Sequence, residues 1–169
     1  MFALHRARTL IHLSDQGELA MDVISLLKAD HKKVKDLFEK LEPTTERGIK
    51  TGTEFFRTLK EALDAHAYIE ETYFYPVLEK SKATHDIALE AVEEHAIVKE
   101  LLAELDELPK DDESWGAKLK VLKENVEHHV EEEEGEMFKK ARQVLSDDEL
   151  ESLGARMEKA KESQLKQAA

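Results

Sequence analysis

Apolar residues recur every three or four positions along most of the chain, and only a few short stretches interrupt them. From Asp22 to Leu41 the spacing is typical of a helix with one buried face. Three later segments repeat the pattern, and they are separated by breaks that contain prolines, glycines or polar runs. The breaks are Pro43 with Gly48 and Gly52, the run Ser81 to Thr84, and Leu108 to Glu113. The pattern therefore predicts four long helices joined by short connections.

The apolar faces of these helices can be written in chain order. They contain Ile24, Leu27, Val34, Phe38 and Leu41; Phe56, Leu59, Leu63, Tyr73 and Val77; Ala88, Ala91, Val98, Leu102 and Leu105; and Leu119, Leu122, Val126 and Met137. Short connections between long helices place consecutive helices antiparallel to each other. We therefore expect an all-α fold, an up-down-up-down antiparallel four-helix bundle over residues 22–145.

Both ends of the chain depart from this pattern. Ser146 and Glu149 have the spacing of a capping box, which predicts a short extra helix within residues 146–169, ending near Leu165 and packed outside the bundle. Residues 1–21 lack sustained helical periodicity. We expect them to form an N-terminal extension, either disordered or upstream of the true start at Met21. Arg6 and Arg8 leave an organelle transit peptide as the alternative.

Composition narrows the class of protein and its partners. Charged residues make up 37% of the 169 positions and aromatics 6%, which favours one domain of long solvated helices. The absence of cysteine excludes disulfides, thiolate metal sites, Fe–S clusters and thiol catalysis, so any metal must have nitrogen and oxygen ligands. The net charge of −13 argues against nucleic acid and anionic membranes as partners. With no apolar run long enough to span a membrane, we expect a cytoplasmic protein.

Each predicted helix carries a histidine on its apolar face near its middle, and two of the histidines are followed four residues later by a glutamate. Residues four apart project from the same side of a helix. In an antiparallel bundle the helix midpoints lie at one level, so these side chains converge. The six are His31, His66, Glu70, His95, His129 and Glu133.

A single buried histidine is more often a hydrogen-bonded core residue than a metal ligand. Here, however, six ionisable groups converge from four helices. Burying two carboxylates without a counter-charge costs several kcal/mol each, and a pair of cations removes that cost. The convergence therefore favours a dinuclear metal site over a metal-free polar network.

His128 competes with its neighbour, because Glu132 also follows it by four positions. The apolar face of the fourth helix leads directly to His129, whereas the line through His128 passes the polar Asn125. We therefore predict that His129 is the ligand and that His128 flanks it. We expect the other acids of residues 131–134 to form a solvated face, and we assign no role to His5, His12 and His85.

At these residues the chain resembles the hemerythrin-like, HHE cation-binding family over about residues 22–143. The resemblance lies in four segments, DVISLLKADHKKVKDLF, HAYIEETYFYPVLEK, EEHAIVKELLAEL and HHVEEEEGEMFKKAR. Aligning the second and fourth segments on His66 and His129 places Glu71 over Glu134 and Tyr75 over Phe138. The two halves of the chain therefore look like repeats.

The resemblance implies a non-haem centre of two oxo- or hydroxo-bridged iron ions. Glu70 and Glu133 would bridge the irons, and the four histidines would be terminal ligands. Imidazole and carboxylate also suit manganese, with zinc as a contaminant. Six protein ligands cannot saturate two octahedral irons, so positions remain for a small ligand, O2, H2O2 or NO.

Two departures from the oxygen-carrying hemerythrins bear on function. Those proteins have a second histidine on the third helix, where this chain has Ala91 or Lys99 at the candidate positions. They also carry an aspartate at a longer spacing from the last histidine than Glu133. The differences favour peroxide decomposition, with peroxidase- or catalase-like turnover in oxidative or nitrosative stress, over reversible oxygen carriage.

The alternative is a non-catalytic module that senses or stores O2, NO or iron, so enzymatic activity stays open at this point. Relatives that repair iron centres usually carry an extra cysteine-bearing segment, which this chain lacks. Tyr73, three residues after Glu70, is either a hydrogen-bond donor to the site or a core aromatic.

Overall fold

The computed structural model describes residues 21–41 and 49–168, and within them it contains helices and no strands. The predicted all-α fold is confirmed. The helices are α1 (Val23–Leu41), α2 (Ile49–Ile69), α3 (Tyr75–Leu78), α4 (His85–Glu107), α5 (Glu113–Glu132), α6 (Phe138–Val144) and α7 (Asp147–Ala168). Two π-helical turns, η2 (Glu70–Phe74) and η3 (Glu133–Met137), join α2 to α3 and α5 to α6 as continuous rods.

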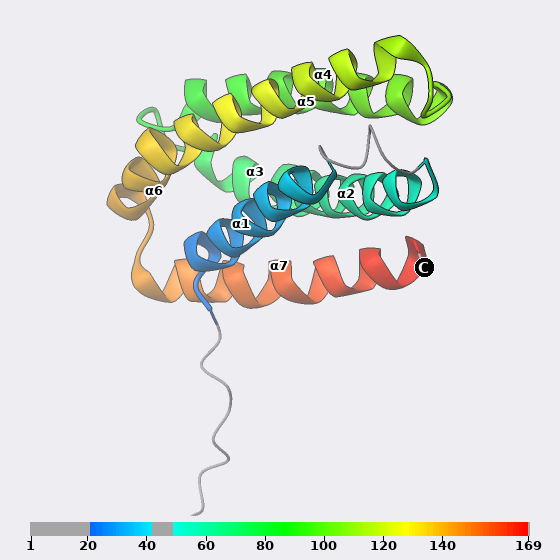
Figure 1. Cartoon of the computed structure of the whole chain (residues 1–169). Helices are drawn as coiled ribbons and strands as arrows, with labels where there is room; N and C mark the ends of the chain where they lie inside the picture. Colours follow the sequence, from blue (N-terminus) through cyan, green and yellow to red (C-terminus); the bar gives the residue numbers. More distant parts are fainter. Residues whose placement is uncertain (1–20, 42–48, 169) are drawn as a thin grey trace, which may run out of the picture.

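Successive long rods run in opposite directions, as the colours in Figure 1 show. In that view α4 and α5 lie side by side above α1 and α2, and α7 runs below them. None of the described helices is both long enough and apolar enough to cross a membrane. The division into an extension, a domain at 22–145 and a tail stays a prediction, and residues 1–20 lie outside the described part of the chain.

Side chains at the helix ends explain where two helices begin. Asp112 Oδ1 accepts a hydrogen bond of 2.8 Å from the Ser114 backbone, which caps α5. Before α7, Glu149 Oε2 accepts from the Ser146 backbone at 2.8 Å, and Ser146 Oγ accepts from the Glu149 backbone at 3.4 Å. The predicted capping box is therefore confirmed.

Two details of the expected helix boundaries are wrong. Gly52 lies inside α2 rather than in the break before it, because the helix already begins at Ile49. The C-terminal helix, predicted to be short and to end near Leu165, continues to Ala168. α7 has 22 residues, and it buries Leu150, Leu153 and Met157 in the same apolar cluster as the start of α1. This buried face stabilises the longer helix.

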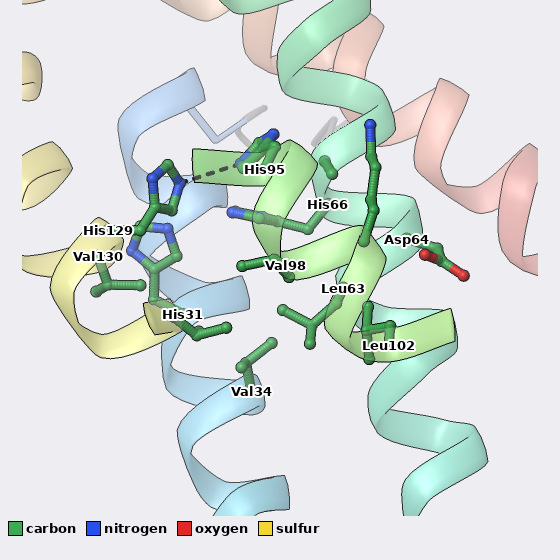
Figure 2. A pocket seen from close by; sticks show the side chains of 13 residues that line it. His31, Val34, Leu63, Asp64, His66, His95, Val98, Leu102, His129 and Val130 are labelled. Atoms are coloured by element: carbon green, nitrogen blue, oxygen red, sulfur yellow. Dashed lines mark hydrogen bonds between the residues drawn. The ribbon is translucent and has the colours of Figure 1, made fainter. Parts of the chain in front are cut away.

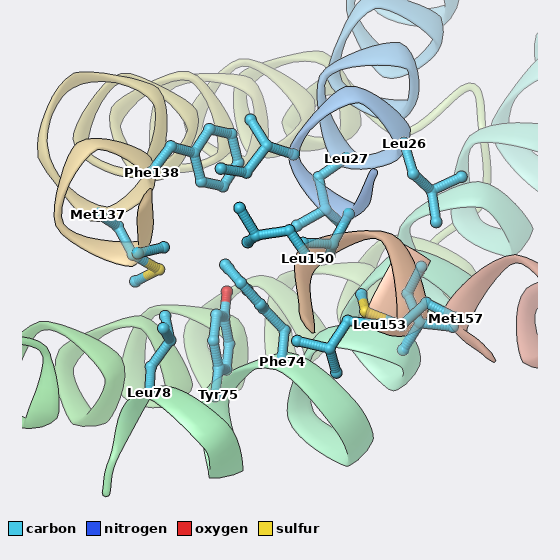
Figure 3. Close-up of a cluster of buried hydrophobic side chains, with 14 of the residues drawn as sticks. Leu26, Leu27, Phe74, Tyr75, Leu78, Met137, Phe138, Leu150, Leu153 and Met157 are labelled. Atoms are coloured by element: carbon cyan, nitrogen blue, oxygen red, sulfur yellow. The ribbon is translucent and has the colours of Figure 1, made fainter. Parts of the chain in front are cut away.

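Two apolar clusters form the core, and the six predicted ligands lie between them. One cluster includes Leu27, Ile69 and Ala91, and the other includes Val34, Leu63 and Val98. Along each of α1, α2 and α4, the predicted ligand histidine lies between a residue of the first cluster and a residue of the second. Figure 3 shows the first cluster, where side chains of α1, α3, α6 and α7 meet. We call the six side chains between the clusters the polar layer.

The π-helical turns shift the buried face by one residue beyond the polar layer. In η2 the Tyr75 backbone N–H bonds to the Glu70 carbonyl five residues earlier, instead of four. The residues buried after Glu70 are consequently Phe74, Tyr75 and Leu78, whereas regular helical spacing predicted Tyr73 and Val77, which are only half-buried. The tyrosine that is fully buried is therefore Tyr75, and not Tyr73 as the regular spacing predicted.

A close approach between α7 and the start of α1 supplies a test of the packing. A Cβ at Gly154 would lie 2.8 Å from both the Asp22 carbonyl carbon and the Val23 backbone nitrogen. We expect Gly154→Ala to lower the free energy of unfolding by about 1–3 kcal/mol, because the backbone must move to admit the methyl group. Chemical denaturation measures this change.

Gly116 on α5 is the matched control, since a Cβ there would meet nothing within 4 Å. Gly116→Ala should leave the free energy of unfolding unchanged or raise it by up to about 1 kcal/mol, through the better helix propensity of alanine. Equal effects of the two substitutions would contradict the predicted tight contact.

Candidate metal centre

The structure brings all six predicted ligands together in the polar layer. The largest exposed fraction among them is 6%, at His31, and Glu70 is fully buried. Their inward atoms are 3.2 Å apart for His31 Nε2 and Glu133 Oε2, 3.1 Å for His66 Nε2 and Glu70 Oε2, 3.4 Å for His95 Nε2 and Glu70 Oε2, and 3.6 Å for His129 Nε2 and Glu133 Oε2. Each glutamate therefore contacts histidines from both halves of the chain.

These separations match those between ligand atoms that share one cation. With metal–ligand bonds of about 2.1 Å, neighbouring ligands are about 3.0 Å apart in octahedral and about 3.4 Å apart in tetrahedral coordination. Two such groups form, one from His31, His66, Glu70 and Glu133, and one from Glu70, His95 and His129. Glu70 belongs to both groups, as a bridging ligand would.

The outward nitrogen of every histidine in the polar layer faces a carboxylate. The Nδ1 contacts are His31 to Glu134 at 2.8 Å, His66 to Asp30 at 3.4 Å, His95 to Glu71 at 3.0 Å and His129 to Glu94 at 2.7 Å. We call these four acids the outer carboxylates. An Nδ1–H that donates to a carboxylate leaves the Nε2 lone pair free to bind a metal, which is the usual arrangement behind metal-ligating histidines.

Several inward atoms have no hydrogen-bond partner, although they are buried. They are His31 Nε2, His66 Nε2, both carboxylate oxygens of Glu70 and Glu133 Oε2. His31 and Glu133 lie within ion-pair distance but lack hydrogen-bond geometry. Leaving such groups unpaired costs several kcal/mol, and bound cations would remove that cost. The residues present therefore fit a metal centre.

In the absence of a cation, the surroundings of the two buried glutamates shift their pKa values in opposite directions. Burial and the neighbouring Glu133 charge raise the pKa of Glu70 well above its usual range. Burial would also raise the pKa of Glu133, but the His31, His129 and His66 imidazoles outweigh it and lower the value to about 2.

The pKa values of His31 and His66, the two histidines of the first half, are also shifted in opposite directions. Burial alone would lower the pKa of His31, but the Glu133 and Glu70 charges raise it to about 9. At His66 burial dominates and lowers the pKa to about 4. Protons thus partly balance the cluster, and divalent cations can displace them.

Tyr75, rather than Tyr73, is the tyrosine that reaches the centre. Its hydroxyl donates a hydrogen bond of 2.9 Å to Glu133 Oε1 and lies 3.4 Å from His95 Nε2. Burial, reinforced by the two glutamate charges, raises its pKa, so the hydroxyl keeps its proton. Tyr73 instead packs beside Arg156, whose Cζ lies 5.3 Å from the ring centroid. The π-helical turn η2 accounts for the difference.

The two halves differ at this position. Phe138 is the counterpart of Tyr75 in the alignment of the halves, and its ring stacks on His31 with centroids 6.0 Å apart. The Tyr75 hydroxyl of the first half therefore lies beside inward atoms of His95 and Glu133 in the second half, whereas the matching Phe138 has no hydroxyl to offer to His31.

A small cavity of about 20 Å³ adjoins the four imidazoles. Figure 2 shows the rings beside apolar side chains of α1, α2, α4 and α5, including Val34, Leu63, Val98, Leu102 and Val130. A volume of this size admits about one water-sized molecule. A groove of about 480 Å³ between α1 and α5 lies on the other side of His31 and shares the wall of Val34, Val126 and Val130. The cavity beside the imidazoles thus has room for a small molecule only.

The sequence interpretation missed the outer carboxylates and Tyr75. Glu134 was expected on a solvated face, but it bonds to His31, so that expectation is wrong for this residue. A usable signal existed, because Asp30 and Glu94 each directly precede a ligand histidine and Glu71 and Glu134 each follow a predicted bridging glutamate. Placing Tyr75 required the π-helical turn.

The two adjacent histidines of α5 occupy different environments. The side chain of His129 is 5% exposed and that of His128 is 63% exposed, close to Glu132 and Glu94 on the surface. This placement agrees with the predicted register. The assignment of the six residues as metal ligands remains a prediction.

Most of the chain is similar to known proteins. The family model for the hemerythrin HHE cation binding domain matches residues 22–141. A solved structure of a hemerythrin HHE cation binding domain-containing protein from Mycobacterium kansasii aligns with a TM-score of 0.76 and 27% identity, over 87% of this chain and 89% of the other.

A curated relative, a DNA nickase from a Nostoc species, is 26% identical over 141 residues, which are 83% of this chain. This alignment spans only 39% of the relative's length.

The register on α5 can be tested by metal content. We expect His129→Ala to lose half or more of the bound iron, because it removes a buried inward nitrogen. His128→Ala, the matched neighbour, should lose little of the iron in the centre. Elemental analysis of protein purified without a histidine tag measures both, and equal losses would mean that the register is wrong.

Proposed function

Because the chain belongs to the hemerythrin HHE cation-binding domain family, we propose that it holds two non-haem iron ions and uses them to decompose hydrogen peroxide. The observation that carries the proposal is the polar layer itself, with six inward-facing ligand atoms beside a cavity of about 20 Å³. In this proposal residues 22–145 form the up-down-up-down bundle and α7 is an added helix.

The donor set supports iron. Four imidazoles and two carboxylates are borderline to hard ligands, which suit iron or manganese more than thiolate-seeking metals. Glu70 and Glu133 would bridge, His31 and His66 would hold one ion, and His95 and His129 the other. When bound, an iron pair would supply two-electron redox chemistry towards a small oxidant.

The side chains around the centre favour a small ligand such as O2, H2O2 or NO. The apolar wall excludes molecules much larger than water from the cavity. Tyr75 holds a proton on its hydroxyl, directed at Glu133 Oε1, and so orients that carboxylate. On α4 the positions one turn from His95 are Ala91, which is buried, and Lys99, which pairs with Glu71. Neither adds a ligand, which favours turnover over reversible carriage.

DNA cleavage, the activity named for the Nostoc relative, is not part of the proposal. The net charge of −13 opposes binding to a phosphate backbone, and most of that relative lies outside the match. We propose a cytoplasmic role in oxidative or nitrosative stress.

Oxygen release from peroxide tests the proposal. The reaction converts two H2O2 into two H2O and one O2, and an oxygen electrode follows it on the iron-loaded protein. We expect His95→Ala to lower the rate by at least about tenfold. Substitution of a residue that only hydrogen-bonds to a metal ligand already lowers activity or metal affinity by about that factor, and His95 is a predicted ligand itself. His85→Ala, an exposed histidine on the same helix, should leave the rate unchanged.

Other outcomes would identify a different function. A stable oxygen adduct of the reduced protein that is released under vacuum would refute turnover and indicate a carrier. Iron binding with neither oxygen release nor such an adduct would favour the sensing or storage alternative.

A further inference from the structure

Each outer carboxylate links a histidine of the polar layer to a second charged or polar side chain farther out. Three of these four links end in a lysine. They are Lys28 to Glu134 and His31, Lys161 to Asp30 and His66, and Lys99 to Glu71 and His95. In each of these three links the positive charge of the lysine balances the negative charge of the outer carboxylate that accepts the hydrogen bond from the histidine.

The fourth link lacks this cation. Glu94 bonds to His129 Nδ1 through Oε2, and its other oxygen, Oε1, lies 3.7 Å from His128 Nε2. Within the described residues, no lysine or arginine lies at ion-pair distance from Glu94. A second carboxylate, Glu132, approaches instead, with Oε1 3.4 Å from the same nitrogen of His128. Two acids and one imidazole therefore meet where the other links have an ammonium group.

The geometry of this surface group fits a cation. Its three candidate ligand atoms, one each from Glu94, His128 and Glu132, lie within 4.8 Å of one another. The two distances from His128 Nε2, 3.4 and 3.7 Å, are close to the separation of about 3.4 Å between ligands of a tetrahedral ion with bonds of about 2.1 Å. Glu94 is held in place by its bond to His129, so one ligand is already oriented.

We propose that Glu94, His128 and Glu132 form a third, surface site for a divalent transition-metal cation, Zn²⁺. The protein supplies one nitrogen and two oxygens, and the exposed position leaves water to complete the coordination. The cation takes the place that lysine occupies behind the other three histidines. Because Glu94 is shared, the site adjoins the buried centre while using none of its inward atoms.

Zinc titration of the iron-loaded protein tests this site by calorimetry, with the iron content measured before and after. We expect one Zn²⁺ per chain to bind without displacing iron. His128→Ala and Glu132→Gln should each weaken this binding by at least about tenfold, because each removes one of three protein ligands. Two controls should bind as the wild type does: His85→Ala, an exposed histidine on α4, and Glu127→Gln, an exposed glutamate on α5.

The proposal is overturned if no zinc binds beyond the buried centre, or if the two site variants bind it as tightly as the controls. A failure of the buried iron centre would be distinguishable. In that case the unmodified chain would lack iron and take up zinc in the centre, but His128→Ala would still bind one equivalent less if the surface site exists.

Discussion

The burial of Glu70 and Glu133 between two apolar clusters is the constraint on which the rest of the structure depends. Each carboxylate must be balanced there, since an uncompensated buried charge costs a large part of the stability of a domain. The four histidines approach from α1, α2, α4 and α5 with Nε2 inward, and an apolar cluster packs on each side of the polar layer. Metal binding and folding are therefore coupled in this account.

The repeat within the chain builds the polar layer from two similar halves. His31 and His95 are each preceded by an acid, and His66 and His129 are each followed by a pair of glutamates and a π-helical turn. The differences between the halves then give the two sides of the polar layer different surroundings. Tyr75 stands where the other half has Phe138, and His128 with Glu132 stands where the other links have lysine.

Much of this could be predicted from the sequence because helical spacing is a local property. The helix faces, the convergence of six ionisable side chains and the choice of His129 over His128 all follow from intervals of three and four residues. The π-helical turns could not be predicted in this way, since five-residue hydrogen bonds depend on how the rod packs beyond Glu70. For this reason the spacing pointed to Tyr73 as a possible hydrogen-bond donor to the site, whereas Tyr75 is the residue that reaches it. The bounds of α7 were close to those predicted, but its packing could not be predicted from spacing, because it depends on tertiary contacts of Leu150, Leu153 and Met157.

The most direct test of the central claim is the free energy of unfolding of the protein with and without its metal. Denaturant titration of the iron-loaded form and of the same protein stripped by a chelator gives the two values. If cations balance the buried carboxylates, the loaded form is more stable by several kcal/mol. A stripped protein that is folded and as stable as the loaded one would contradict the account, because the polar layer would then be balanced without metal.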